Sequence, residues 1–99
     1  MDRRKAREYA FILLFQYKFQ PEEISEILAD FFKEYETGKQ GEYISAVVSG
    51  AVKNIEQVDG MITRFAKGWT IDRLGAVSLA VLRLGVCEML YLEDVPLPV

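Results

Sequence analysis

The sequence predicts an all-α protein, a compact bundle of about five helices that forms one domain over residues 1–99. Apolar residues recur at helical spacing along the chain, and no stretch alternates apolar and polar residues in the manner of a half-buried strand. The chain has 99 residues and 51% of them are hydrophobic, so it is long enough for one core and too apolar to be disordered.

The first two helices are expected in the N-terminal third. Residues 3–19 carry one apolar stripe that faces the core, and a second stripe of three phenylalanines, Phe11, Phe15 and Phe19. These phenylalanines suit either the core or stacking on bases beside a basic helix end. A second helix begins at Pro21, which suits a first helical position, and runs to about Tyr35.

The later helices are predicted from the same periodicity. One long helix is expected over residues 42–68 because its apolar stripe is unbroken, with a bend near Gly50 or Gly60. A short helical turn is expected at 71–74, and Ser78 is a candidate N-cap for a last helix over residues 79–92. That helix is apolar almost all round, which is typical of a central helix.

Charged residues in the last helix need partners elsewhere. Arg83 and Glu88 are five residues apart, a poor spacing for a pair on one helix, so Glu8 is a candidate partner for Arg83. After the helix, residues 93–99 combine acids with prolines and are typical of a linker. The domain is therefore expected to be C-terminally incomplete, its central helix covered by a further helical segment or by another chain.

Composition excludes most catalytic chemistry. The chain has no histidine and one cysteine, Cys87, so neither a Cys/His dyad nor a usual zinc site can form. The serines lack an activating histidine, and the glycines match neither a phosphate loop nor a dinucleotide fingerprint. We expect no enzyme, metal or cofactor. Neither a membrane span nor a secretory signal is expected, which favours the cytoplasm.

Charge is separated along the chain although its net value is -3. Residues 1–20 carry five positive and two negative charges, residues 21–60 carry three and nine, and residues 61–99 carry four and four. The positive cluster consists of Arg3, Arg4, Lys5 and Arg7. A concentrated basic patch attracts polyanions such as nucleic acid, whereas the alternative is a solvated helix end.

Three segments resemble the NusB family of transcription antitermination factors, which have an all-helical RNA-binding fold. Residues 3–10 (Arg-Arg-Lys-Ala-Arg-Glu-Tyr-Ala), continuing to Leu-Phe-Gln at 14–16, are similar to the family's arginine-rich first helix. Residues 58–62 (Val-Asp-Gly-Met-Ile), Trp69 and residues 72–74 (Asp-Arg-Leu) are similar to the family's pattern at the end of its third helix. The most specific match is residues 80–90 (Ala-Val-Leu-Arg-Leu-Gly-Val-Cys-Glu-Met-Leu) with Asp-Val-Pro at 94–96.

The resemblance implies a factor that binds boxA RNA of ribosomal RNA leader transcripts together with the ribosomal protein NusE, and that acts in an RNA polymerase antitermination complex. It implies RNA-binding roles for Arg3, Arg4, Lys5, Arg7, Phe15 and Tyr17. It implies a NusE-binding surface around Arg73, Val77, Ser78 and Val81, although Ser78 stands where relatives often have an acid.

Two alternatives stay open on the sequence alone. The same fold occurs as the N-terminal RNA-binding module of a ribosomal RNA cytosine methyltransferase. A helical oligomerisation domain, with an exposed apolar groove that forms a homodimer, is the other alternative.

Overall fold

The computed structural model describes residues 1–66, 68 and 70–91, and every regular element in this part of the chain is helical. Trp69 and the expected linker at 93–99 lie outside the described residues. The prediction of an all-α fold is confirmed. In chain order the elements are α1 (Arg3–Phe19), the 3-10 helix η1 (Pro21–Glu23), α2 (Ile24–Glu34), α3 (Gln40–Lys53), α4 (Ile55–Phe65), the 3-10 helix η2 (Ile71–Arg73) and α5 (Ala76–Tyr91).

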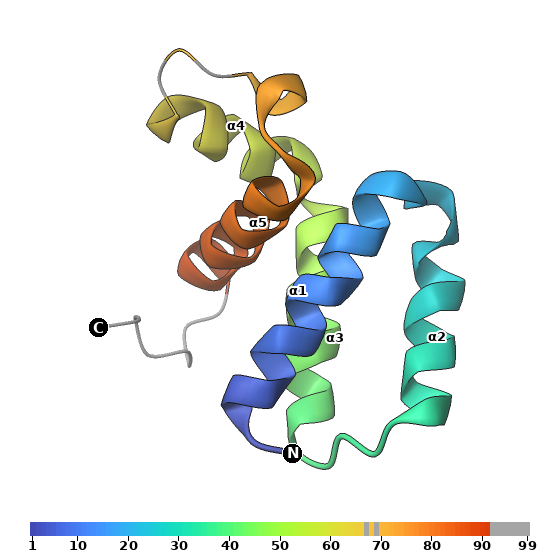
Figure 1. Cartoon of the computed structure of the whole chain (residues 1–99). Coiled ribbons are helices and arrows are strands. Elements are labelled where there is room, and N and C mark those ends of the chain that lie inside the picture. The colour runs from blue at the N-terminus through green and yellow to red at the C-terminus, as the bar shows by residue number, and fades with distance from the viewer. Residues whose placement is uncertain (67, 69, 92–99) are drawn as a thin grey trace.

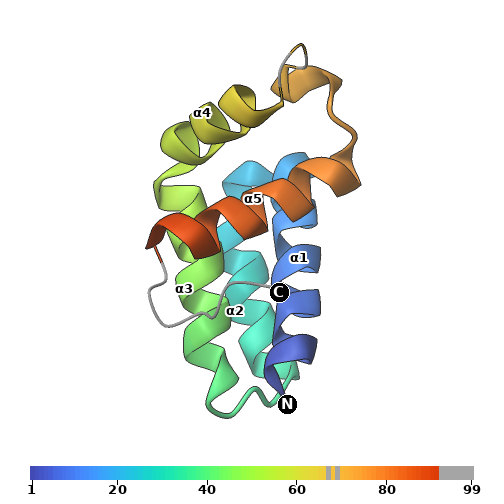
Figure 2. The same cartoon turned by 90° about the vertical axis from the view of Figure 1, so that its left-hand side faces the viewer.

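The first three long helices stand side by side (Figure 1). α1 and α3 run in the same direction, and α2 runs back between them in the sequence, so the first residues of α1 and α3 meet at one end of the bundle. Figure 2 shows α5 crossing this layer, where it packs on both α1 and α3. α4 packs on α5 beyond the end of α3.

The core has two parts, and α5 belongs to both. The larger cluster joins α1, α2 and α3 and includes Ala80 and Cys87 of α5. The smaller cluster joins Val58 and Ile62 of α4 to Leu79 of α5. Because α5 buries side chains on two sides, its almost wholly apolar sequence follows from its place between the clusters. The expectation of a central helix is confirmed.

The expectation of one long helix over residues 42–68 is wrong. The helix breaks at Asn54, which ends α3 and precedes α4. The side-chain amide of Asn54 donates to the carbonyl oxygen of Gly50 at 2.9 Å, and its backbone N–H donates to the same oxygen at 3.0 Å. These two hydrogen bonds end α3. The apolar periodicity continues across the break, so the sequence pattern does not reveal the break.

The expectation that Ser78 caps the last helix is also wrong. The backbone N–H of Leu79 already donates to the carbonyl oxygen of Gly75 at 2.9 Å, so α5 begins at Ala76. Ser78 is the third residue of the helix and lies on its exposed side.

Arg83 binds Asp59 rather than Glu8. Its Nε and Nη2 donate to the two carboxylate oxygens of Asp59, each at 2.9 Å, and this ion pair ties α5 to α4. Glu8 instead lies 3.1 Å from the Nζ of Lys5, one turn earlier on α1. The expected partner is wrong because the crossing of α4 and α5, which brings Asp59 to Arg83, leaves no local signature in the sequence.

Candidate nucleic-acid interface

The N-terminal ends of α1 and α3 meet at one end of the molecule (Figure 1). Arg3 Nε donates to Oε1 of Gln40, the first residue of α3, at 2.6 Å. Asp2 caps α1, because its Oδ1 accepts from the backbone N–H of Lys5 at 2.8 Å. Helix N-termini carry partial positive charge, so two parallel helices that start together add to the charge of the nearby basic side chains.

Two of the four basic residues in the first two turns of α1 are exposed to solvent. Arg4 is exposed, and it borders a shallow hollow with Lys5 and Glu8. The hydrogen bond to Glu8, together with its charge, raises the pKa of Lys5. Both partners are more than half exposed, so water screens this pair and a phosphate can replace it at little cost.

The other two basic residues are held by neighbouring helices. The guanidinium of Arg3 lies 4.1 Å from the centre of the Tyr43 ring, a cation–π contact. Arg7 Nη2 lies 3.0 Å from Oε2 of Glu88, and the Tyr43 hydroxyl donates to Oε1 of the same carboxylate at 3.0 Å. These four residues connect α1 to α3 and α5 and fix the direction of both arginines.

The environment of Tyr43 keeps this network in one protonation state. Burial, and to a smaller extent the charge of Glu88, raises the pKa of Tyr43 to about 12, so its hydroxyl remains a donor at neutral pH. Within the described residues, Nε of Arg7 is buried without a hydrogen-bond partner. Arg7 is therefore tied to Glu88 through one nitrogen and has donor capacity left over.

The two aromatic candidates lie on different faces of α1. Phe15 is half-buried and packs against the larger core cluster, and its ring is parallel to that of Phe11, with centroids 6.5 Å apart. It lies three turns beyond Arg4 on the same helix face, roughly 16 Å along the axis. Tyr17 packs against the larger core cluster, and the centre of its ring lies 5.6 Å from the guanidinium carbon of Arg83. The structure thus brings Phe15, and not Tyr17, onto the face that carries Arg4.

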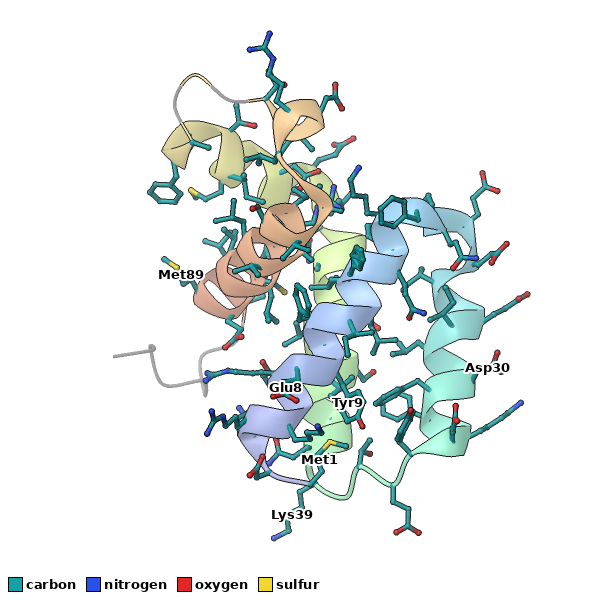
Figure 3. The ribbon with its side chains drawn as sticks, viewed as in Figure 1. Met1, Glu8, Tyr9, Asp30, Lys39 and Met89 are labelled. Atoms are coloured by element: carbon teal, nitrogen blue, oxygen red, sulfur yellow. The ribbon has the colours of Figure 1, made fainter. Side chains whose placement is uncertain are left out.

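Sequence reasoning missed Lys39. This residue directly precedes α3, is exposed, and lies at the same end of the molecule as Met1 (Figure 3). It belongs to residues 21–60, which are acidic overall, so the net charge of that stretch does not reveal this basic residue. A basic residue just before a helix start is the signal that could have found it.

The residues expected to bind a protein partner are all exposed. Arg73 ends η2, and Val77, Ser78 and Val81 occupy the first turns of α5. Val77 is 57% and Val81 is 52% exposed, and with Met89 they form one apolar line along the outer face of α5. Figure 3 shows Met89 pointing away from α1 and α3. An exposed apolar line of this kind is typical of a surface that contacts another protein segment.

The described part of the chain contains no group of three His, Cys, Asp or Glu side chains placed to hold a metal ion. None of its helices combines the length and apolar character needed to cross a membrane.

Comparison with known proteins gives a consistent result. The model of the NusB family matches residues 4–99. The chain is 40% identical over 91 residues to the transcription antitermination protein NusB of Thermoanaerobacter sp. (strain X514), covering 92% of this chain and 65% of that protein. It is 39% identical over 100 residues to the protein of the same name from Acetivibrio thermocellus, covering 100% of this chain and 69% of that protein. No solved structure matches. The chain spans about two thirds of the length of these relatives.

Proposed function

The chain belongs to the NusB family, and from this we propose that it is a transcription antitermination factor of the cytoplasm that binds boxA-type RNA together with NusE. The observation that carries the proposal is the concentration of positive charge where α1 and α3 begin. Exposed Arg4, Lys5 and Lys39 and two helix N-termini meet there, on a chain with a net charge of -3.

The four basic residues in the first two turns of α1 divide into two roles in this proposal. Arg4 and Lys5 contact phosphates directly, because both are exposed and the phosphates of the RNA backbone can replace the water around their side chains. Arg3 and Arg7 present their remaining donors in a direction set by Tyr43 and Glu88. An arginine that is already oriented loses less side-chain entropy when RNA binds.

Aromatic stacking completes the proposed RNA path. Phe15 lies on the α1 face that continues from Arg4, beside the parallel ring of Phe11. Unpaired RNA bases stack on such rings. Tyr17 contributes from the other face by supporting the helix, because its ring contacts the guanidinium of Arg83 on α5.

NusE binds, in this proposal, along the outer face of α5. Val77 and Val81 supply apolar contacts, while Arg73 and Ser78 supply polar ones at the start of that face. We expect Val81→Asp to weaken NusE binding at least tenfold and to leave binding of RNA alone unchanged, as measured by calorimetry with purified NusE. The same face also suits a second copy of the chain, so the mass in solution is determined by light scattering before NusE is added.

The experiment that tests RNA binding is a titration of a boxA-type RNA oligonucleotide across a salt series, with and without NusE. Replacing both Arg4 and Lys5 by Ala removes two phosphate contacts. The slope of log K against log salt should become shallower by about 1.4, because each contact to a single strand contributes about 0.7.

The matched control replaces Lys33 and Lys53 by Ala, which removes the same charge from exposed positions on α2 and α3. The control should leave the slope within about 0.3 of the parent value. Equal slopes for both double variants would show that net charge, and not this end of the molecule, attracts the RNA.

A further inference from the structure

α1 and α2 border an open surface groove of about 350 Å³. The two helices run in opposite directions and are joined by the short η1 segment (Figure 1). The floor of the groove is apolar and consists of Ile12, Leu13, Ile27 and Phe31. Ile12 is 46% exposed, so part of this floor is accessible from solvent. The groove lies on a different face of α1 from Arg4 and Phe15, and the proposed RNA path does not use it.

One rim of the groove is negatively charged. Asp30 and Glu34 line it from α2, one helical turn apart, and neither forms an ion pair within the described residues. Glu34 is the last residue of α2, where the helix dipole is negative and disfavours a carboxylate. The dipole and the two side chains therefore add to one negative potential, and an anionic ligand such as RNA is repelled from this rim.

One end of the groove is aromatic. The rings of Tyr9, Phe31 and Tyr35 form a cluster with centroid distances of 4.9 to 5.2 Å. Tyr9 lies between α1 and α2 (Figure 3), and Tyr35 is 39% exposed. The face of an exposed tyrosine ring attracts lysine and arginine side chains. The aromatic end thus favours the same charge of ligand as the acidic rim.

We propose that this groove binds a basic amphipathic helix of a partner protein. Apolar side chains at positions i, i+3 and i+4 of that helix would occupy the floor over Ile12 and Ile27, as in other helix-in-groove complexes. Two basic residues one turn apart would face Asp30 and Glu34, which have the same spacing. Charge complementarity selects this occupant, and the basic end of α1 remains free for RNA at the same time.

The test uses a synthetic peptide of about 16 residues that has leucines on one helical face and lysines on its flanks. A scrambled peptide of the same composition reports non-specific attraction. Binding of both to the full chain is followed by fluorescence anisotropy at physiological salt. We expect the amphipathic peptide to bind at least tenfold more tightly than the scrambled one.

Variants assign the binding to the groove. Asp30→Lys with Glu34→Lys should weaken peptide binding at least tenfold, and Ile12→Ser should weaken it about threefold or more. The matched control, Glu56→Lys with Asp72→Lys, makes the same charge change at exposed positions outside the groove and should change affinity less than about twofold. Asp30→Asn with Glu34→Gln provides a milder pair if the charge reversal disturbs folding, which circular dichroism would report.

Three results would overturn the proposal: equal affinity for the two peptides, equal weakening by the groove and control variants, or no peptide binding. Self-association that the groove variants abolish, without peptide binding, would assign the groove to a second copy and would also overturn it. All groove variants should bind boxA-type RNA with the parent's affinity or slightly better, so the outcome is independent of the proposed function.

Discussion

Neutralising Asp59 should destabilise the protein far more than neutralising an exposed carboxylate. The side chain of Arg83 is 9% exposed and that of Asp59 is 24% exposed, and two hydrogen bonds of 2.9 Å join them. In Asp59→Asn the amide nitrogen is a donor that faces the donors of Arg83, so a buried guanidinium loses its counter-charge and one or both hydrogen bonds.

The magnitude depends on burial. Removing one partner of a fully buried ion pair costs about 3 to 5 kcal/mol, and the partial exposure of Asp59 lowers this to about 2 to 4 kcal/mol. For a domain of this size each kcal/mol lowers Tm by roughly 4 to 8 °C. Asp59→Asn should therefore lower Tm by roughly 8 to 32 °C.

Urea unfolding followed by circular dichroism at the helical band measures the loss. The control is Glu56→Gln, an exposed carboxylate on the same helix, which should cost less than about 0.5 kcal/mol. A double variant, Asp59→Leu with Arg83→Met, removes both charges and should be clearly more stable than Asp59→Asn. The reasoning is refuted if Asp59→Asn costs less than about 0.5 kcal/mol, or if the double variant is the least stable of the three.

Three further outcomes are expected. Glu88→Gln should weaken RNA binding a few-fold, by releasing Arg7 and Tyr43, while leaving the salt slope unchanged; a large fall in the slope would mean that Glu88 acts on phosphate contacts instead. Alkaline pH should destabilise the fold, because burial raises the pKa of Tyr43 to about 12 and that of Cys87 to about 11. The contribution of these two groups to the free energy of unfolding is fully present below their pKa values in the unfolded chain, about 10 and 9. It is lost as pH rises through their pKa values in the folded protein, so a urea midpoint that stays unchanged between pH 8 and 11 would contradict the prediction. Gly60→Ala should raise the free energy of unfolding by about 0.5 to 1 kcal/mol, since nothing lies within 4 Å of the added methyl group and Ala is the better helix former; a destabilised variant in urea would speak against this.

Much of the fold is predictable because helix formation is local. The sequence predicts a first helix over residues 3–19, and α1 has these bounds. Helical hydrogen bonds join residues four apart, so the apolar period and the flanking residues carry most of the information. The break at Asn54 escapes prediction because the apolar stripe continues at helical spacing from α3 into α4. The spacing of apolar residues shows that both segments are helical, but it does not show that the helix axis changes direction between them.

The candidate site is predictable in part. The sequence indicates the basic residues of α1, and it cannot separate exposed Arg4 and Lys5 from Arg3 and Arg7, which neighbouring helices hold. It also groups Phe15 with Tyr17, although two residues that are two positions apart on a helix point in nearly opposite directions. The RNA-binding and partner-binding roles of these residues stay predictions until binding is measured.

By itself, then, the sequence determined the helical class, the bounds of the first helix and the segregation of charge, because these depend on neighbours along the chain. The tertiary structure alone decided which charges meet. Arg83 pairs with Asp59, 24 positions away, and Arg7 pairs with Glu88, 81 positions away. Such pairs depend on how α5 crosses α1 and α4. That crossing is set by the packing of side chains from all the helices in the core, so no single segment of the sequence reveals it.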